Sequence, residues 1–158
     1  MRWRPLLLVA ALVSCGRESA REDAASTPLP MTAARLRELS WLEGRWRGTE
    51  SGTGAFFEAY RFVNDSLIRS YSYDSTGRTI TDSGAITLSE GIVSTGDSSV
   101  RWVLTALDSV SAHFEPVRGA INTFTWTKVK GGGWTATLSV PGGGDTVRSR
   151  VYDMQPVP

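Results

Sequence analysis

The chain has 158 residues, with 17 lysines and arginines against 16 aspartates and glutamates, and it contains one cysteine and one histidine. This balance lacks the basic field that nucleic-acid phosphates attract, so a nucleic-acid partner is not expected. The single cysteine excludes an internal disulfide framework and a multi-thiolate metal site, and no histidines or carboxylates cluster as a metal site requires.

The first fourteen residues have the pattern of a secretory signal peptide. Arg2 and Arg4 precede an apolar run over residues 5–13, and these nine residues are too few to cross a hydrocarbon layer of about 30 Å. We therefore expect residues 1–14 to be removed. Their loss takes away two of the 17 basic residues, so that 15 remain against 16 acidic ones.

The end of this signal holds the only cysteine. Leu12-Val13-Ser14-Cys15 resembles the bacterial lipobox, and the resemblance implies that Cys15 is acylated, becomes the new N-terminus and attaches the protein to membrane lipid. Several acyl chains make such an anchor effectively permanent, although the protein does not span the membrane. The alternatives are a plain secretory signal with a stray cysteine and a redox thiol.

The residue after the cysteine bears on location within the cell envelope. Many Gram-negative lipoproteins that stay at the inner membrane have an aspartate there, and this chain has Gly16. By this resemblance we expect a bacterial envelope protein at the outer membrane, facing the periplasm. In a bacterium with one membrane, the same signal implies the outer cell surface.

Residues 15–30 are expected to form the lipidated cysteine and a flexible tether. Residues 16–30 show no apolar periodicity and end in Pro28-Leu29-Pro30, so they cannot bury enough surface to offset the entropy of ordering. The remaining residues, 31–158, suffice for one compact domain with its own core.

One short helix is expected at the start of this domain, over residues 32–40. Thr32 can cap it, and Leu36 and Leu39 fall on one face. We expect it to lie across one end of a barrel. The next stretch, residues 41–48, reads Trp-Leu-Glu-Gly-Arg-Trp-Arg-Gly and is predicted to be the strand that opens this barrel.

After Gly48 the apolar pattern has a period of two, which is typical of β-strands. Turn residues separate the strands, although Asp82-Ser83-Gly84 is consistent with either a hairpin turn or a bulge. The pattern predicts an all-β, single antiparallel up-and-down β-barrel of 8–10 strands, in preference to a two-sheet sandwich, because the connections are short. The expected strands are 45–50, 55–62, 67–73, 79–88, 92–95, 100–107, 110–114, 120–129, 134–140 and 146–152.

The opening Gly44-x-Trp46 resembles the first strand of lipocalins and other calycin barrels. The whole domain also resembles a family of uncharacterised bacterial calycin-like domains of unknown function, which begin with Trp-Leu-x-Gly-x-Trp-x-Gly. Residues 41–48 match that motif, with Trp41, Gly44, Trp46 and Gly48 at its fixed positions. A later Phe-Glu-Asn-Pro segment and Asp-Phe-Pro turn of the family are matched only in part, by residues 113–120.

The calycin resemblance implies a further contact and a ligand. Calycins carry an arginine near the end of the last strand that lies over the tryptophan of the first strand, and Arg148 and Arg150 are the candidates here. Barrels of this strand number are wide enough for one small ligand. The candidate ligand-lining residues are Tyr60, Arg69, Tyr71, Trp102, Phe124, Trp126 and Trp134. The alternative is that the aromatic rings fill a collapsed core.

Polar candidates inside the barrel are few. Glu58 and Arg69 would anchor a ligand head group if both pointed inward, while an ion pair on the outer face is the simpler expectation for them. The sequence also suggests a solvated rim for the carboxylates that lie on or near strands, which are Glu50, Glu58, Asp82 and Glu115.

Catalytic chemistry is not expected. With Cys15 acylated and no Gly-x-Ser-x-Gly elbow, no nucleophile has an oriented base. His113 is expected in a loop or at the rim. Barrels resembling nitrobindin share the Gly-x-Trp-x-Gly start and hold haem through one histidine near the C-terminus, where this chain has Arg148, Arg150 and Tyr152. We therefore expect no cofactor.

The sequence thus predicts a non-enzymatic bacterial envelope lipoprotein that binds a small apolar or amphipathic ligand in a β-barrel. The alternative is a structural or protein-interaction module of the envelope with a filled barrel, whose outer face meets another envelope protein.

Overall fold

The computed structural model describes residues 27–50, 54–143 and 146–158. The expected lipidation site, Cys15, and the signal peptide lie outside these described residues. Within them, no helix is both long enough and apolar enough to cross a membrane.

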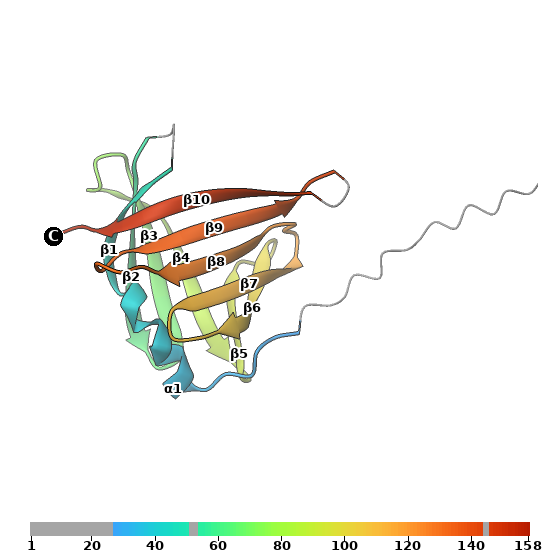
Figure 1. Cartoon of the computed structure of the whole chain (residues 1–158). Coiled ribbons are helices and arrows are strands. Elements are labelled where there is room, and N and C mark those ends of the chain that lie inside the picture. The colour runs from blue at the N-terminus through green and yellow to red at the C-terminus, as the bar shows by residue number, and fades with distance from the viewer. Residues whose placement is uncertain (1–26, 51–53, 144–145) are drawn as a thin grey trace, which may run out of the picture.

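Ten antiparallel strands form one closed barrel in which each strand pairs with its neighbours in the chain, and the last strand pairs with the first (Figure 1). The predicted up-and-down barrel is therefore confirmed, and the two-sheet sandwich is excluded. The strands are β1 (Gly44–Thr49), β2 (Phe56–Asn64), β3 (Leu67–Tyr73), β4 (Ile80–Ser89), β5 (Ile92–Gly96), β6 (Arg101–Leu107), β7 (Ser111–Arg118), β8 (Thr123–Lys128), β9 (Trp134–Pro141) and β10 (Val147–Pro156).

All ten expected strands are present, with shifted ends. Asp82-Ser83-Gly84 lies inside β4, and the pairing with β3 skips Thr81, so the irregularity is a bulge and not a hairpin turn. β7 continues past the expected end at residue 114 and includes Pro116. The pairing of β6 with β7 skips Val117, and a bulge is where a strand tolerates the missing N–H of proline.

A helical segment closes one end of the barrel (Figure 1). It begins as α1 (Ala33–Leu36), where the Thr32 Oγ1 atom accepts a hydrogen bond from the Arg35 N–H at 3.3 Å, and it continues as the 3₁₀ helix η1 (Arg37–Leu42). A 3₁₀ helix has three residues per turn, so side chains three apart align. Leu36, Leu39 and Leu42 are accordingly all fully buried.

Trp41 and Leu42 belong to η1, so the prediction that the first strand includes them is wrong. Gly44 makes the change from helix to strand, with a φ of +133° that side-chain-bearing residues rarely adopt. Trp46 then faces inward, and its indole Nε1 donates to the Leu42 carbonyl at 2.7 Å. This bond ties the start of β1 to the end of the helical segment.

The chain before the helix is docked on the barrel. Leu29 N–H donates to the Leu104 carbonyl, and Met31 N–H donates to the Gly91 carbonyl, both at 2.8 Å. Met31 is buried, and Leu29 packs against the core. The expected domain boundary at residue 31 therefore falls inside a segment that already belongs to the folded unit.

Arg148 and Arg150 do not lie over Trp46. Arg150 pairs with Leu138, whereas the partner of Trp46 on β10 is Pro156, which is six residues or roughly 20 Å further along the strand. The Arg150 side chain is 68% exposed, and its Nε lies 3.4 Å from Glu50 Oε1. Trp46 packs against Trp134 instead, with their ring centroids 5.8 Å apart.

Candidate ligand-binding cavity

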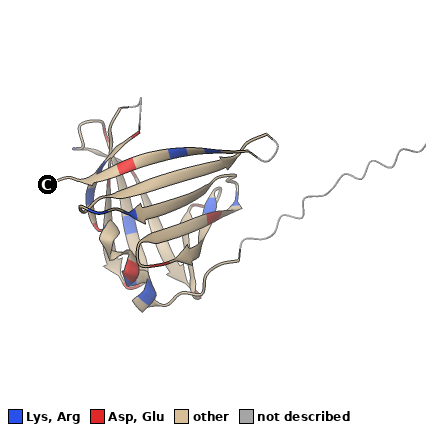
Figure 2. Ribbon diagram, viewed as in Figure 1, with Lys and Arg blue, Asp and Glu red and all other residues tan. Residues whose placement is uncertain are grey.

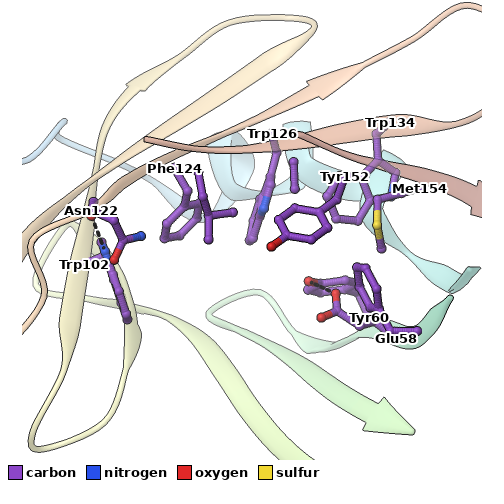
Figure 3. A pocket seen from close by; sticks show the side chains of 12 residues that line it. Glu58, Tyr60, Trp102, Asn122, Phe124, Trp126, Trp134, Tyr152 and Met154 are labelled. Carbon is purple, nitrogen blue, oxygen red and sulfur yellow. Dashed lines mark hydrogen bonds between the residues drawn. The ribbon is translucent and has the colours of Figure 1, made fainter. Parts of the chain in front are cut away.

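A cavity of about 450 Å³ occupies the inside of the barrel. Inward-facing positions of β2, β6, β8, β9 and β10, together with one residue of the loop before β8, provide its walls (Figure 3). The lining residues are Phe56, Glu58, Tyr60, Trp102, Asn122, Phe124, Trp126, Trp134, Ala136, Leu138, Tyr152 and Met154.

The cavity has a closed floor and an open mouth. Trp134 and Met154 are each only 1% exposed, and Trp134 contacts Trp41 of the helical segment with a centroid distance of 6.2 Å. Further along the same strands, Leu138 and Tyr152 are partly exposed. The helical segment therefore seals the end at Trp134, and the mouth lies at the opposite end of the barrel.

Aromatic rings make up most of the wall. Trp126 lies between Tyr60 and Trp134, with edge-to-face contacts at centroid distances of 5.8 and 5.9 Å. Phe124 stacks on Phe114 at 4.6 Å. Among the described residues, the buried Nε1 atoms of Trp41 and Trp134 have no hydrogen-bond partner. The wall is thus largely apolar, with a few fixed polar atoms.

Glu58 is the acidic group in this wall. It shares the inward face of β2 with Phe56 and Tyr60, and the Tyr60 hydroxyl donates to Glu58 Oε2 at 2.8 Å. Burial raises the pKa of Glu58, and the hydrogen bond from Tyr60 opposes this rise. Burial and the neighbouring carboxylate both raise the pKa of Tyr60. In Figure 3 both side chains face Tyr152 and Met154 across the cavity.

Asn122 supplies a second polar group. Its backbone carbonyl accepts a hydrogen bond from Trp102 Nε1 at 2.8 Å, which orients the Trp102 ring (Figure 3). The Asn122 residue is partly exposed and lines the cavity. Its amide can both donate and accept hydrogen bonds.

A second hollow of about 370 Å³ adjoins the cavity and shares four of its aromatic residues. Its other side is polar and includes Ser70, Asp82, Thr95 and Asp97. Across the part of the chain that the structure describes, neither hollow is lined by a lysine, arginine or histidine. Figure 2 shows basic and acidic residues interspersed along the strands and the helical segment. The cavity wall is therefore aromatic and carries the Glu58 carboxylate, while Asp82 and Asp97 are exposed.

Five of the seven predicted lining residues lie in the cavity wall, namely Tyr60, Trp102, Phe124, Trp126 and Trp134. Arg69 and Tyr71 do not. They pair with Arg61 and Ala59, on the opposite face of the sheet from the buried Ile68. Arg69 is exposed on the outside of the barrel.

The expected pairing of Glu58 with Arg69 is wrong in both of its forms. Glu58 pairs in register with Ser72 and points inward, whereas Arg69 points outward beside Arg61. Glu58 also does not belong to a solvated rim. The alternation of Phe56, Glu58 and Tyr60 along β2 was the sequence signal that places this carboxylate inside.

Several wall residues were not identified from the sequence. Phe56, Tyr152 and Met154 share the inward phase of their strands, so alternation could have found them. Asn122 lies in the loop before β8, but it falls within the expected strand 120–129 and in phase with Phe124 and Trp126, so the same alternation applied to it.

His113 lies in the middle of β7 on the outer face, between the buried Ala112 and Phe114, and not in a loop or at the rim. Its Nδ1 is 2.7 Å from Thr125 Oγ1, and its Nε2 is 3.6 Å from Glu115 Oε1. It therefore does not face the cavity. In the described parts of the chain, no three histidine, cysteine, aspartate or glutamate residues group as metal ligands would.

The raised pKa of Glu58 makes stability depend on pH in a defined direction. The folded state holds the proton more tightly than the unfolded state, whose pKa is near the ordinary 4.5. This tighter proton binding stabilises the folded state fully below pH 4.5, and the stabilisation is lost as the pH rises through the folded-state pKa. We expect Glu58→Gln to remove this loss, so that the variant is the more stable protein at neutral pH. Urea unfolding across a pH series checks this, and parallel curves for the two proteins would contradict it.

Comparisons of the chain with protein-family models, with curated proteins and with solved structures found no match. The barrel and its cavity are therefore the features that bear on function.

Proposed function

We propose that this chain is a non-enzymatic lipoprotein of the bacterial cell envelope that binds a small apolar or amphipathic molecule inside its barrel. The cavity of about 450 Å³ is the observation that carries the proposal. Small-molecule sites are concave, have mainly hydrophobic and aromatic walls, and hold a few polar groups that orient the ligand. Glu58, Tyr60 and Asn122 provide such groups.

The envelope location rests on the N-terminal sequence. Arg2, Arg4 and the apolar run that follows suit a signal peptide, and the lipobox resemblance suits acylation of Cys15. On this proposal the protein is attached to lipid through Cys15 and lies at the outer membrane, facing the periplasm.

The size of the cavity favours ligand binding over the filled-barrel alternative. Protein interiors are packed about as densely as organic crystals, and a core that serves only stability has few voids larger than one water molecule. A module that acts only through its outer face has no need for an open space lined by three tryptophans, two tyrosines and two phenylalanines.

The direct test is native mass spectrometry of the protein purified from its own host in lipid nanodiscs. A small molecule that travels with the protein and is lost on denaturation would support the proposal and give the class of ligand. A bare polypeptide mass, unchanged after incubation with envelope extracts, would refute it and favour a protein partner.

A substitution that fills the cavity should prevent binding. Ala136 is buried and faces the cavity from β9, level with Trp126 and Tyr152. We expect Ala136→Trp to reduce the fraction of ligand-bound protein at least tenfold, because its indole occupies the space of the ligand. Thr137→Trp places the same ring on the outer face and is the matched control. Equal ligand occupancy in the two variants would contradict the proposal.

A further inference from the structure

We propose that the cavity selects small apolar amines, and that Glu58 is the residue that recognises the amine. This inference rests on the proposed ligand-binding function and specifies its ligand. An amphipathic ligand can carry a cationic, neutral or anionic head group, and the residues inside the barrel distinguish among these three.

The first observation is the position of the Glu58 carboxylate. It lies in the wall between Phe56 and Tyr60, with Trp46 as its register partner on β1. Oε2 accepts the Tyr60 hydroxyl at 2.8 Å, and no other described residue donates to this side chain. The remaining acceptor capacity is available to a ligand, and an ammonium group is a donor with the complementary charge.

The second observation is the absence of a basic counter-charge. In residues 27–50, 54–143 and 146–158, no lysine, arginine or histidine lines the cavity or the adjoining hollow. Arg150 shares the inward phase of β10 and is the register partner of Leu138, so it lies at the mouth, where its side chain is 68% exposed and its Nε lies 3.4 Å from Glu50 Oε1. A partly buried carboxylate without a counter-ion is costly, and a bound cation would reduce that cost.

Two further acidic side chains, Asp82 and Asp97, border the adjoining hollow, and both are exposed. Asp97 accepts hydrogen bonds from the Ser99 and Val100 N–H groups in its own turn, at 2.7 and 2.9 Å. Solvent screens these two charges, so the repulsion that a fatty acid or another carboxylate ligand would meet comes from Glu58.

The third observation is the aromatic wall. The rings of Tyr60, Trp126 and Trp134 pack against one another and line the same cavity as Glu58. Aromatic faces attract cations, and the attraction is stronger where water is excluded. The same rings provide an apolar surface for the body of the ligand. Together, the carboxylate and the rings suit a ligand in which an amine is attached to an aromatic or aliphatic group.

Three ligands with one indole skeleton test the proposal. Tryptamine carries an ammonium group, tryptophol a hydroxyl and indolepropionate a carboxylate. Each is titrated by calorimetry into the protein in nanodiscs, with empty nanodiscs as the blank. We expect tryptamine to bind at least about tenfold more tightly than the other two, which is the usual scale of a hydrogen bond to a charged group.

The variant Glu58→Gln keeps the shape of the side chain and removes its charge. We expect it to weaken tryptamine binding about tenfold and to weaken tryptophol binding much less, because the tryptophol hydroxyl carries no charge. The control is Glu38→Gln, the same change at a helical glutamate that is exposed and pairs with Arg35. The control should bind all three ligands as the unaltered protein does.

The outcomes separate the two proposals. If tryptophol or indolepropionate binds as tightly as tryptamine, the cavity binds ligands and the amine selectivity is wrong. If Glu58→Gln and Glu38→Gln bind tryptamine equally, Glu58 does not recognise the amine. If none of the three binds, ligand binding itself fails for molecules of this size, and the selectivity fails with it. The ranking on the unaltered protein needs no variant to fold.

Discussion

Replacing Trp134 with alanine should lower the free energy of unfolding by about 3–5 kcal/mol, the usual cost of truncating a buried large aromatic side chain. Trp134 is 1% exposed and packs edge-to-face against Trp41, Trp46, Tyr60 and Trp126. Its loss would remove the floor of the cavity and the contact between β9 and the helical segment.

Denaturant unfolding followed by far-UV circular dichroism measures this effect without relying on tryptophan fluorescence. Thr135→Ala, at the next position and on the outer face of β9, is the matched control and should stay within about 0.5 kcal/mol of the unaltered protein. A loss below 1 kcal/mol for Trp134→Ala would mean that the ring is not part of a tightly packed floor.

Gly48→Val should destabilise the barrel by about 1–3 kcal/mol and displace the Phe56 ring. Phe56 is the register partner of Gly48, and a Cβ at position 48 would lie 2.1–2.6 Å from three atoms of that ring. The ring therefore covers the glycine and contacts Tyr152, with the centroids 5.5 Å apart. A side chain at position 48 would break this arrangement in the wall of the cavity.

The same unfolding measurement tests this expectation. Gly54→Val is the control, because no heavy atom of the described residues lies within 4 Å of a Cβ at that position. If the two variants are equally stable, the close approach of Phe56 to Gly48 contributes nothing to the fold. The presence of glycine at position 48, the last position of the motif over residues 41–48, would then have a cause other than the packing of Phe56.

The strands were predictable because two local signals agreed. Apolar residues alternate along β8 and β9, where Phe124 and Trp126 face the core, as do Trp134 and Ala136. Polar residues mark the turns. Asp74, for example, accepts hydrogen bonds from the Thr76 hydroxyl and the Arg78 N–H group at 2.7 and 3.0 Å, and these bonds hold its pKa well below the usual range. Such contacts span only a few residues, so a sequence shows them directly.

The inward face of β3 was assigned wrongly because its aromatic residues point outward and its small polar residues point inward. The inward positions after Ile68 are the small polar residues Ser70 and Ser72, while the aromatic Tyr71 and Tyr73 face outward. Tyr73 is stabilised there by Arg45, whose guanidinium lies 5.0 Å from its ring centroid. A cation on β1, with β2 between it and β3, can thus hold an aromatic ring on the outer face, and single-strand patterns do not reveal the partner.

The cavity itself could not be predicted from the residues that line it. The radius of a barrel depends on the number of strands, their tilt and their stagger, and these arise from pairing between distant segments. The same aromatic side chains would fill a narrower barrel and leave space in a wider one. Only the closed ring of ten strands shows that Trp126 and Tyr60 border an open volume.

The hydrogen-bonded seam between β1 and β10 bears on how the protein folds. Trp46 and Pro156 are register partners more than a hundred positions apart, and a topology that depends on such distant contacts folds slowly. A chain still emerging from the ribosome lacks β10, so β1 and β9 keep open edges and the ring cannot close. The polypeptide therefore stays without its closed ring until β10 has been synthesised.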